Sequence, residues 1–389
     1  MLLFWSSVTA SVIAVVGCGY LLAAMVLVGR STRDRAGGAA TASEPDVTIL
    51  KPLYGGEPGL FENLATFCDQ NYSSRIQIVF GVHNPHDDAV AVVERLRKAR
   101  TASDLDLVVD TKVHGLNRKV SNLVNMAPAI RHEVVIVSDS DMRVDPGYLQ
   151  RVVAALERPG VGAVTCLYYG MPLASVWARL SALAINSHFL PGVLLGLALG
   201  RARPCFGSTI ALRRRRLEEI GGFIAFVDCL ADDYAIGAAL RTRGHTISIP
   251  PFAIAHMCTQ TSLRELWQHE LRWARTIRSI DPVGYAGSIL AHPLPWALLA
   301  VLAAGASPIL LPAIGVAVAS ILCRMALLQQ VEDAYALPPQ AYWLVPAGDL
   351  FSFALLVSSF LGWGVSWKGH RYRMVEGRGW MADRGSHAS

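Results

Sequence analysis

Charged residues are scarce in this chain. Asp, Glu, Lys and Arg make up 17% of its 389 residues, whereas a soluble domain carries roughly 25%. Hydrophobic residues make up 52%, and the mean hydropathy is +0.36. This composition disfavours a freely soluble protein and predicts segments that lie in a membrane.

Two further absences exclude classes of site. The seven cysteines are scattered and none forms a CxxC pair, so neither a zinc site nor a disulfide framework is indicated. No GxGxxG follows the first predicted strand, which argues against a dinucleotide-binding Rossmann site. The net charge of +5 suits lipid headgroups or a nucleotide phosphate, but it also fits an ordinary surface-basic membrane protein. We expect no nucleic-acid partner.

The first apolar segment predicts an anchor. Residues 1–28 carry no charge and are long enough to cross a bilayer. Neither a basic n-region nor a small-residue cleavage site accompanies them, so residues 1–29 are expected to be a retained transmembrane anchor. Arg30, Arg33 and Arg35 follow directly, which predicts that the next domain lies in the cytoplasm.

The C-terminal apolar region, residues 292–367, predicts two or three further spans. Its first run is too long for one helix across about 30 Å of hydrocarbon, and Pro308 and Pro312 offer a break for a hairpin. A last candidate covers 342–367. Three such spans would place the basic tail, residues 368–389, outside the cytoplasm and against the charge rule, so the sequence leaves their number open.

Between these regions, residues 45–285 alternate short apolar runs with amphipathic segments of helical length. The runs are VTIL (47–50), IQIVFGV (76–82), LDLVV (105–109), EVVIVSD (133–139) and VGAVTCL (161–167). This alternation predicts a mostly parallel sheet with helices on both faces. Ligands of such sheets bind at the carboxyl ends of the strands, where Lys51, Asn84 and Asp139 are expected.

Two aspartates, Asp139 and Asp141, follow the fourth apolar run directly. Their carboxylates repel each other unless a cation or a ligand offsets the repulsion, and Mg²⁺ or Mn²⁺ bridging to a diphosphate would do so. The alternative is structural, because Asp139 or Asp145 could cap a helix that starts near Pro146.

A second acidic pair, Asp232 and Asp233, lies in CLADDYAIG. The functional reading places one carboxylate beside an acceptor hydroxyl as a general base. The structural alternative is that both acids interact with the dipole at a helix N-terminus. Lys119, near the start of another predicted helix, could reach a phosphate or a sugar.

A basic stripe is predicted in QHELRWARTIR, where Arg272, Arg275 and Arg278 recur every three residues. On a helix the stripe could neutralise a departing diphosphate, or it could rest on the bilayer surface. A shorter apolar segment, residues 190–200, is expected either to lie in the membrane interface or to be a buried core helix.

Taken in order, these motifs resemble the ceramide-glucosyltransferase type of membrane glycosyltransferase, family 21. VTILKPLYGGEPGLFENLATF, LNRKVSNL, VSDSDMRV, GGFIAFVDCLADDY and HELRWARTIR carry the resemblance. HELRWARTIRSIDPVGYAGS and the following HPLP are most similar to bacterial hopanoid-biosynthesis glycosyltransferases. The resemblance implies a GT-A-like nucleotide-sugar transferase domain and a multi-pass protein of the bacterial inner membrane.

The family pattern of three acids followed by (Q/R)xxRW implies roles for individual residues. Asp139 matches the second acid, associated with the nucleotide sugar, and Asp141 occupies the metal position. Asp233 matches the third acid, the catalytic base. Two positions depart from the pattern, and the family's roles are least secure there. Asn84, or a shifted Asp87 or Asp88, stands at the first acid, and His269 stands at the Q/R position.

Arg272 and Trp273 match the final RW. The resemblance further implies UDP-N-acetylglucosamine as donor and the hopanoid bacteriohopanetetrol as acceptor, with inversion at the anomeric carbon. Transfer of glucose to ceramide or diacylglycerol is the alternative within the same chemistry. A non-catalytic membrane scaffold with a degenerate transferase domain is the alternative outside it.

Overall fold

A computed structural model describes the chain except for residues 32–43, 368–369, 376–378 and 383–389. Arg33, Arg35 and part of the predicted basic tail lie outside the described residues. The apolar helix α1 (Leu2–Ser31) precedes this first gap, and the first strand follows it.

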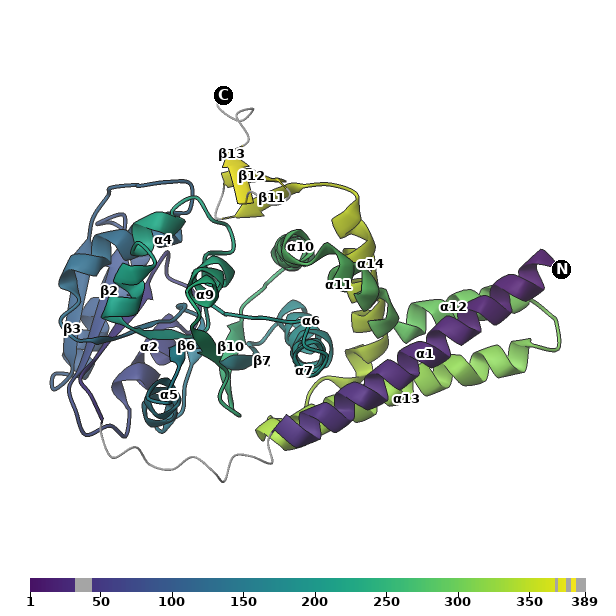
Figure 1. The fold of residues 1–389 in the computed structure, drawn as a ribbon. Helices are drawn as coiled ribbons and strands as arrows, with labels where there is room; N and C mark the ends of the chain where they lie inside the picture. Colours follow the sequence, from purple (N-terminus) through teal and green to yellow (C-terminus); the bar gives the residue numbers. More distant parts are fainter. Residues whose placement is uncertain (32–43, 368–369, 376–378, 383–389) are drawn as a thin grey trace.

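A seven-stranded sheet forms the centre of the domain (Figure 1), in the order β3-β2-β1-β4-β8-β6-β9. Its strands are β1 (Val47–Pro52), β2 (Ile76–Val82), β3 (Asp104–Val109), β4 (Val134–Val137), β6 (Val161–Val164), β8 (Ile210–Arg213) and β9 (Thr246–Ser248). β1 to β4 are parallel, as predicted. β8 is antiparallel to both β4 and β6, which the sequence did not predict.

Both faces of this sheet are buried, which explains why its strands are continuous apolar runs rather than alternating ones. Along β1, Val47 and Ile49 join one core cluster and Leu50 joins the other. The covering helices are α2 (Leu60–Cys68), α3 (Asp88–Ala99), α4 (Arg118–Met126), α5 (Tyr148–Leu156), α8 (Arg214–Glu219) and α9 (Asp232–Thr242). The expected GT-A-like α/β architecture is confirmed.

A small second sheet lies beside the first. It has the order β5-β10-β7, with β5 (Met142–Arg143), β7 (Leu167–Pro172) and β10 (Ala253–Cys258). β5 follows the Asp139–Asp141 turn at once, and its register pairs Met142 with His256. The second sheet therefore brings β10 to the acidic turn.

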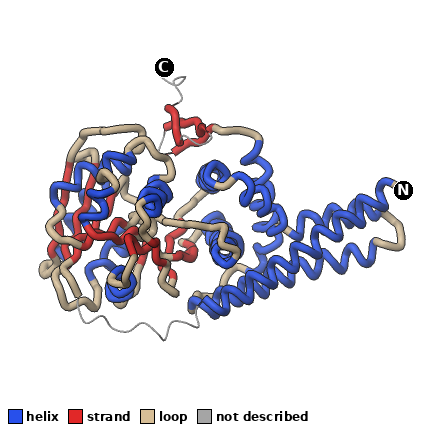
Figure 2. Tube along the Cα trace, viewed as in Figure 1, coloured by secondary structure: helices blue, strands red, loops and turns tan. Residues whose placement is uncertain are grey.

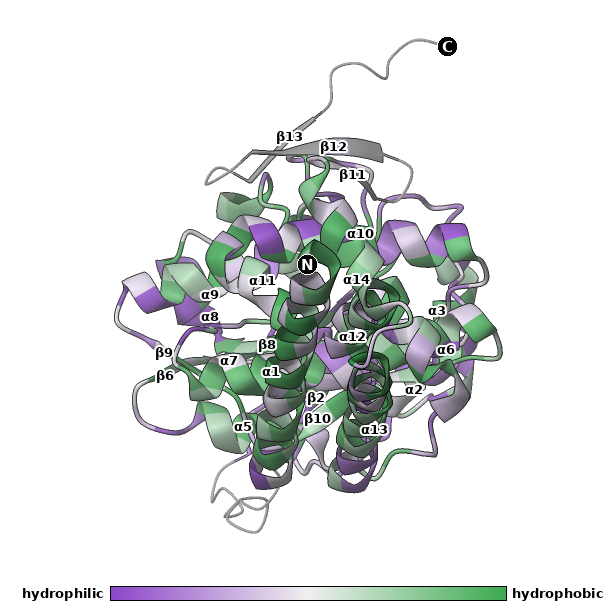
Figure 3. Cartoon of the chain, turned by 90° about the vertical axis from the view of Figure 1, so that its right-hand side faces the viewer, coloured by the Kyte–Doolittle hydropathy of each residue, from purple (hydrophilic) through white to green (hydrophobic). Residues whose placement is uncertain are grey.

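Apolar helices form a separate part of the molecule, without strands (Figure 2). α1, α12 (Pro293–Ala304) and α13 (Leu310–Tyr335) pack together and project from the body, with the N-terminus at the tip (Figure 1). Most of their residues are hydrophobic (Figure 3). Helical structure is interrupted between α12 and α13 at residues 305–309. These include Pro308, one of the two prolines at which the sequence predicted a break.

Four described helices are long and apolar enough to cross a membrane. They are Leu2–Ser31, Val176–Ala198, Leu310–Tyr335 and Tyr342–Phe360. A fifth crossing results if the pair Pro282–Ala291 and Pro293–Ala304, bent by 58°, counts as one span.

Residues 190–200, predicted to be an interfacial segment or a buried core helix, are part of a longer helix. It forms α7 (Leu190–Ala198), which continues from α6 (Val176–Ala184) through a π-helical turn, Ile185–Phe189. Together they make one helix of 23 residues. Asn186 and Ser187 lie inside this helix, which has an 18-residue stretch with a mean hydropathy of 1.5, still high enough for a span.

The remaining elements connect the domain to the C-terminus. α10 (Leu263–Ile280) leads through α11 (Pro282–Gly287) to α12, and α14 (Val345–Phe360) packs against α10. A third sheet of β11 (Gly364–Trp367), β12 (His370–Val375) and β13 (Gly379–Ala382) follows. The described part of the predicted basic tail thus lies mostly in strands.

Candidate active site

The Asp139–Asp141 turn lies at the carboxyl end of β4, where the sequence predicts it. Asp139 does not cap α5, because that helix begins at Tyr148 after Gly147. Asp145 serves the turn before α5, since its Oδ1 accepts from the Gly147 N–H at 2.9 Å. The structural alternative for Asp139 is therefore wrong.

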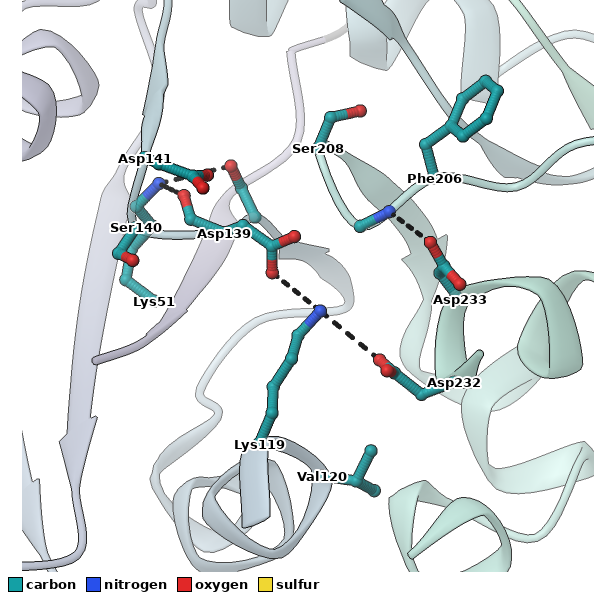
Figure 4. Close-up of polar contacts among 12 residues, drawn as sticks. Lys51, Lys119, Val120, Asp139, Ser140, Asp141, Phe206, Ser208, Asp232 and Asp233 are labelled. Carbon is teal, nitrogen blue, oxygen red and sulfur yellow. Dashed lines mark hydrogen bonds and ion pairs between the residues drawn. The ribbon is translucent and has the colours of Figure 1, made fainter. Parts of the chain in front are cut away.

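Lys51 lies beneath this turn and has no solvent exposure. Its Nζ donates to the Asp139 carbonyl at 2.6 Å and to Ser138 Oγ at 3.2 Å, and it lies 3.7 Å from the Phe67 ring centroid (Figure 4). Burial lowers the pKa of Lys51 to about 7, although neighbouring carboxylates oppose the shift. Lys51 thus supports the backbone of the turn from below.

Lys119 links the two acidic pairs. Asn117 caps α4 with its side chain, which places Lys119 in the first turn of that helix. The Lys119 Nζ lies 2.7 Å from Asp139 Oδ1 and 3.4 Å from Asp232 Oδ2 (Figure 4). Burial alone would lower the pKa of Lys119, but Asp139, Asp232 and Asp233 together raise it. One ammonium group therefore serves both motifs.

Asp233 differs from its three acidic neighbours, because no ion pair holds its carboxylate among the described residues. Its Oδ2 accepts from the Gly207 N–H at 2.9 Å and its Oδ1 from the Tyr234 N–H at 2.7 Å. Burial, followed by the charge of Asp232, raises the pKa of Asp233 to about 6. A carboxylate with this pKa is ionised at neutral pH yet more basic than usual, as a general base requires.

Gly207 lies between the two motifs. Its carbonyl accepts from the Asp139 N–H at 3.1 Å, while its own N–H donates to Asp233. A Cβ at this position would lie 2.5 Å from Asp139 Oδ2 and 3.0 Å from Lys119 Nζ. The close approach of these charged groups therefore requires glycine.

Asp141 is paired with a histidine that the sequence analysis missed. The His256 Nε2, on β10, lies 3.3 Å from Asp141 Oδ2. His256 is 3% exposed. Burial acts against the charge of His256, but Asp141 raises its pKa well above the ordinary value. His256 follows four apolar residues. A single polar residue within an apolar strand was the signal by which the sequence could have shown it.

The residues present fit a divalent cation. Asp141 Oδ1 is buried and has no hydrogen-bond partner among the described residues, so one carboxylate oxygen is left for a further ligand. His256 would add a nitrogen once deprotonated. The described residues contain no cluster of three or more acidic, histidine or cysteine side chains that could hold a metal alone. A cation here would need substrate phosphates and water, which is how Mg²⁺ is usually held.

α10 closes the site from the side of the apolar helices. Arg272 is close enough to Asp139, Glu270 and Asp141 for their charges to oppose the lowering of its pKa by burial. Trp273 packs 4.8 Å from the His269 ring and 5.7 Å from the His256 ring. His269 Nδ1 lies 3.2 Å from Glu270 Oε1. All three predicted residues of this helix therefore lie beside the acidic turn.

The other two arginines of the predicted basic stripe do not face the site. Arg275 Nη1 donates to the Gly364 carbonyl, and Arg278 donates to the carbonyls of Ser359 and Gly362. Arg278 also lies 3.9 Å from the Trp363 ring centroid. The stripe prediction is wrong for these two residues, because the C-terminal segment packs on that turn of α10 and takes their N–H groups.

Asn84 lies exposed at the end of β2, where its Oδ1 accepts from the His86 N–H at 2.9 Å. The shifted alternatives have structural contacts of their own. Asp87 caps α3 through the Ala89 N–H, and Asp88 lies in the first turn of that helix. The role of Asn84 toward the nucleotide stays a prediction.

The profile described as "Glycosyl transferase family 21" matches residues 9–379. Ceramide glucosyltransferase 1 of Caenorhabditis elegans is 25% identical over 232 residues, which are 59% of this chain and 49% of that protein. Ceramide glucosyltransferase 3 of the same organism is 26% identical over 276 residues, 68% of this chain and 59% of that protein. The matches thus span about half the length of these relatives.

Solved structures show weaker likenesses. A mannosyltransferase from Pyrobaculum calidifontis, in complex with GDP-Man and Mn²⁺, is 20% identical, with a TM-score of 0.47, covering 90% of this chain and 99% of that chain. Residues 1–349 of S. aureus TarS, in complex with UDP-GlcNAc, are 12% identical, with a TM-score of 0.38, covering 86% and 99%. At these scores the likenesses bear on neither donor nor acceptor.

Proposed function

The chain belongs to glycosyl transferase family 21, and we propose that it transfers N-acetylglucosamine from UDP-N-acetylglucosamine to a hydroxyl of a hopanoid lipid, bacteriohopanetetrol, with inversion. The observation that carries the transferase assignment is the carboxylate of Asp233, which has a raised pKa and no ion pair among the described residues. It lies beside Lys119, which bridges Asp139 and Asp232. Family membership argues against the alternative of a non-catalytic scaffold.

In the proposed reaction, the lipid hydroxyl attacks the anomeric carbon from the face opposite the axial phosphate. The bond between that carbon and the UDP oxygen breaks, the new glycosidic bond forms, and the hydroxyl proton passes to Asp233. Asp233 is suited to this role because its Oδ atoms are held by two backbone N–H groups and its pKa is raised to about 6.

The departing diphosphate needs positive charge around it. Arg272 and Lys119 supply fixed positive charge beside the acidic turn. Mg²⁺ or Mn²⁺ would be held by Asp141 and, with it, His256 or Asp139. When bound, such a cation would neutralise charge on the leaving group. Trp273, His269 and Asn84 are proposed to contact the nucleotide sugar.

Two donor and acceptor pairs compete. The stretch HELRWARTIRSIDPVGYAGS and the following HPLP support the hopanoid reading through their resemblance. The relatives described as ceramide glucosyltransferases favour transfer of glucose from UDP-glucose to ceramide, the second candidate. The two candidate reactions share the same chemistry and differ in the donor sugar and the acceptor lipid.

A location in the bacterial inner membrane is part of the proposal. The four candidate spans support membrane insertion. Arg30, directly after the apolar part of α1, supports a cytoplasmic position for the domain that begins near residue 45 and ends near residue 285. A cytoplasmic domain would face the compartment that contains UDP-sugars.

The test uses membranes that contain the full chain. They are incubated with radiolabelled UDP-N-acetylglucosamine or UDP-glucose, each with bacteriohopanetetrol or ceramide, in the presence and absence of EDTA. Membranes with the Asp233→Asn variant serve as the blank. The proposal expects label in bacteriohopanetetrol from UDP-N-acetylglucosamine, with a strong decrease in EDTA.

The other outcomes are equally informative. Labelled ceramide from UDP-glucose, without labelled hopanoid, would establish the second candidate and overturn the first. An absence of transfer from either donor to either lipid, in membranes that bind UDP, would overturn both. Transfer that is unaffected by EDTA would remove the cation from the proposal and leave the rest intact.

A further inference from the structure

One aromatic side chain joins the candidate spanning helices to the site. Phe189, in the π-helical turn of the 23-residue helix, is partly buried and packs against both the core of the large sheet and the core formed by α1, α7 and α13. Its ring centroid lies 6.1 Å from Trp273 and 5.5 Å from Phe206. Phe206 directly precedes Gly207, whose N–H binds Asp233.

This placement matters for a lipid acceptor. A lipid hydroxyl must reach Asp233 while the rest of the lipid stays among apolar side chains. Phe189 lies on a candidate spanning helix and directly contacts Phe206, the residue that precedes Gly207. Phe189 therefore links the candidate spanning helix to the segment whose Gly207 N–H binds Asp233.

A buried ionic cluster holds the backbone around Phe189. Arg324 on α13 and Asp349 on α14 are each 1% exposed, and Arg324 Nε lies 2.8 Å from Asp349 Oδ1. His188, the residue next to Phe189, places its Nε2 3.0 Å from the same oxygen. We call Arg324, Asp349 and His188 the helix-bundle cluster. It fixes the neighbour of Phe189 to two other helices.

The same guanidinium supports two interruptions of helical structure. Arg324 Nη1 donates to the Ser187 carbonyl at 2.6 Å, inside the π-helical turn, and Nη2 donates to the Ala291 carbonyl at the 58° bend before α12. Carbonyls at such breaks lose intrahelical partners, which is costly in an apolar setting. π-helical turns also occur frequently at functional sites. Arg324 thus stabilises the unusual backbone that presents Phe189.

We propose that Phe189 is an acceptor-facing residue that packs against the lipid beside Asp233, and that the helix-bundle cluster positions it. The inference rests on the proposed lipid acceptor. The acceptor class it implies is a lipid whose hydroxyl lies close to an apolar segment that can contact an aromatic ring. Arg324, Asp349 and His188 touch no reacting atom and act through the π-helical turn.

The experiment measures steady-state transfer and UDP affinity for full-length variants in liposomes. The probes are UDP-N-acetylglucosamine with bacteriohopanetetrol, or UDP-glucose with ceramide if only that pair is active. The variants are Phe189→Leu, Phe189→Tyr, Arg324→Lys and Asp349→Asn. Phe351→Leu is the matched control, because Phe351 is also a partly buried phenylalanine of a candidate span but packs against Trp267 instead of the site.

The proposal expects Phe189→Leu to raise the KM for the lipid about tenfold or more, while the KM for the UDP-sugar and the Kd for UDP change less than twofold. Phe189→Tyr, which keeps an aromatic ring, should have a lipid KM much closer to the wild-type value than Phe189→Leu has. Arg324→Lys and Asp349→Asn should also raise the lipid KM selectively. Phe189→Leu combined with Asp349→Asn should be clearly less than additive, because both changes act on one contact.

Several results would overturn the inference. One is a parallel rise in the KM values for lipid and UDP-sugar in the Phe189 variants, and another is an effect of Phe351→Leu as large as that of Phe189→Leu. A loss of thermal stability in the cluster variants with unchanged lipid KM would leave the cluster purely structural. A wild-type protein that glycosylates no lipid would instead overturn the proposed function, so the two failures are distinguishable.

Discussion

Two ionic clusters lie in this molecule, one buried among apolar helices and one only partly buried, and they differ in how their charges are paired. In the helix-bundle cluster, Asp349 is matched by Arg324 and His188, and the guanidinium also binds two carbonyls. In the carboxylate cluster (Asp139, Asp141, Asp232 and Asp233), Lys119 serves two acids at once. Asp233 has no ion pair among the described residues, whereas Asp141 Oδ1 and Asp349 Oδ2 each lack a hydrogen-bond partner there.

The difference separates architecture from chemistry. A buried carboxylate with opposite charges beside it can hold helices in one arrangement, although its desolvation is costly. A buried carboxylate without a cation is destabilising, and it persists where it has a use such as proton transfer or ligand binding. Asp233, the one aspartate of the two clusters without an ion pair among the described residues, therefore marks the site.

The largest expected effect is the difference between replacing Asp233 and replacing Asp349. Asp233→Asn keeps the size of the side chain but removes the base, so kcat should fall by about 10² to 10⁴-fold while the Kd for UDP stays within a few fold. Thermal stability should change little, because the cost of a partly buried charge is removed while one of two backbone N–H groups loses its acceptor. Asp349→Asn should lower thermal stability, because it leaves Arg324 buried and unmatched.

Steady-state kinetics, UDP titration calorimetry and thermal denaturation together check this contrast. A loss of UDP binding in Asp233→Asn would make Asp233 a binding residue instead of a base. Stabilisation by Asp349→Asn would remove the proposed distinction between the two clusters.

The next effect compares arginines of one helix. Arg272→Ala should lower kcat/KM by about 10² to 10³-fold, because it removes positive charge beside the departing diphosphate. Arg275→Ala, three residues further along α10, should change kcat/KM less than threefold, because that side chain binds a C-terminal carbonyl. Initial rates at varied UDP-sugar concentration measure both. Equal losses would restore the basic stripe that the sequence predicted.

A smaller loss is expected from Gly207→Ala. The new Cβ would lie 2.5 Å from Asp139 Oδ2, so the carboxylate, Lys119 or the Gly207 backbone must shift. A displacement of about 1 Å in such a site can reduce the rate about 10²-fold. Gly160→Ala is a control outside the site with open space around it, although its positive φ adds some strain. Wild-type kinetics in Gly207→Ala would show that the spacing of the two motifs is unimportant.

The mildest perturbation is a change of pH. Because the pKa of Asp233 is raised from 3.8 to about 6, the base binds a proton as the pH falls through 6. kcat/KM should then fall about tenfold per pH unit below 6, and the profile should be flat from about pH 7 to 8. Asp232→Asn removes a charge that raises this pKa and should move the inflection to lower pH. An inflection near 4 in the wild type would contradict the assignment.

Much of the site was predictable, because the chemistry follows strand ends. Asp139 and Asp141 were expected at the carboxyl end of an apolar strand, and they lie just beyond β4. The contact of Lys119 with both Asp139 and Asp232 was harder to predict from the sequence. It requires α4, β4 and α9 to converge, which depends on strand order, and nothing local in the sequence encodes the antiparallel insertion of β8.

Other features were hidden for distinct physical reasons. His256 lies in an apolar strand, and only the register of β10 against β5 shows that it faces Asp141. Arg275 and Arg278 have the right helical spacing for a stripe, but contacts with residues more than 80 positions away decide their direction. The helix that contains Phe189 was predicted only in part, as residues 190–200, because polar Asn186 and Ser187 precede that apolar run.

The most direct test of the account is the anomeric configuration of the product. The central claim is a single displacement in which Asp233 deprotonates the lipid hydroxyl while UDP leaves from the opposite face. Proton NMR of the purified glycolipid, made by the wild-type protein in liposomes from an α-linked UDP-sugar, reports this through the coupling of the anomeric proton. The account predicts a β-glycoside. An α-glycoside would contradict it, because retention requires either a second nucleophile or attack from the leaving-group face.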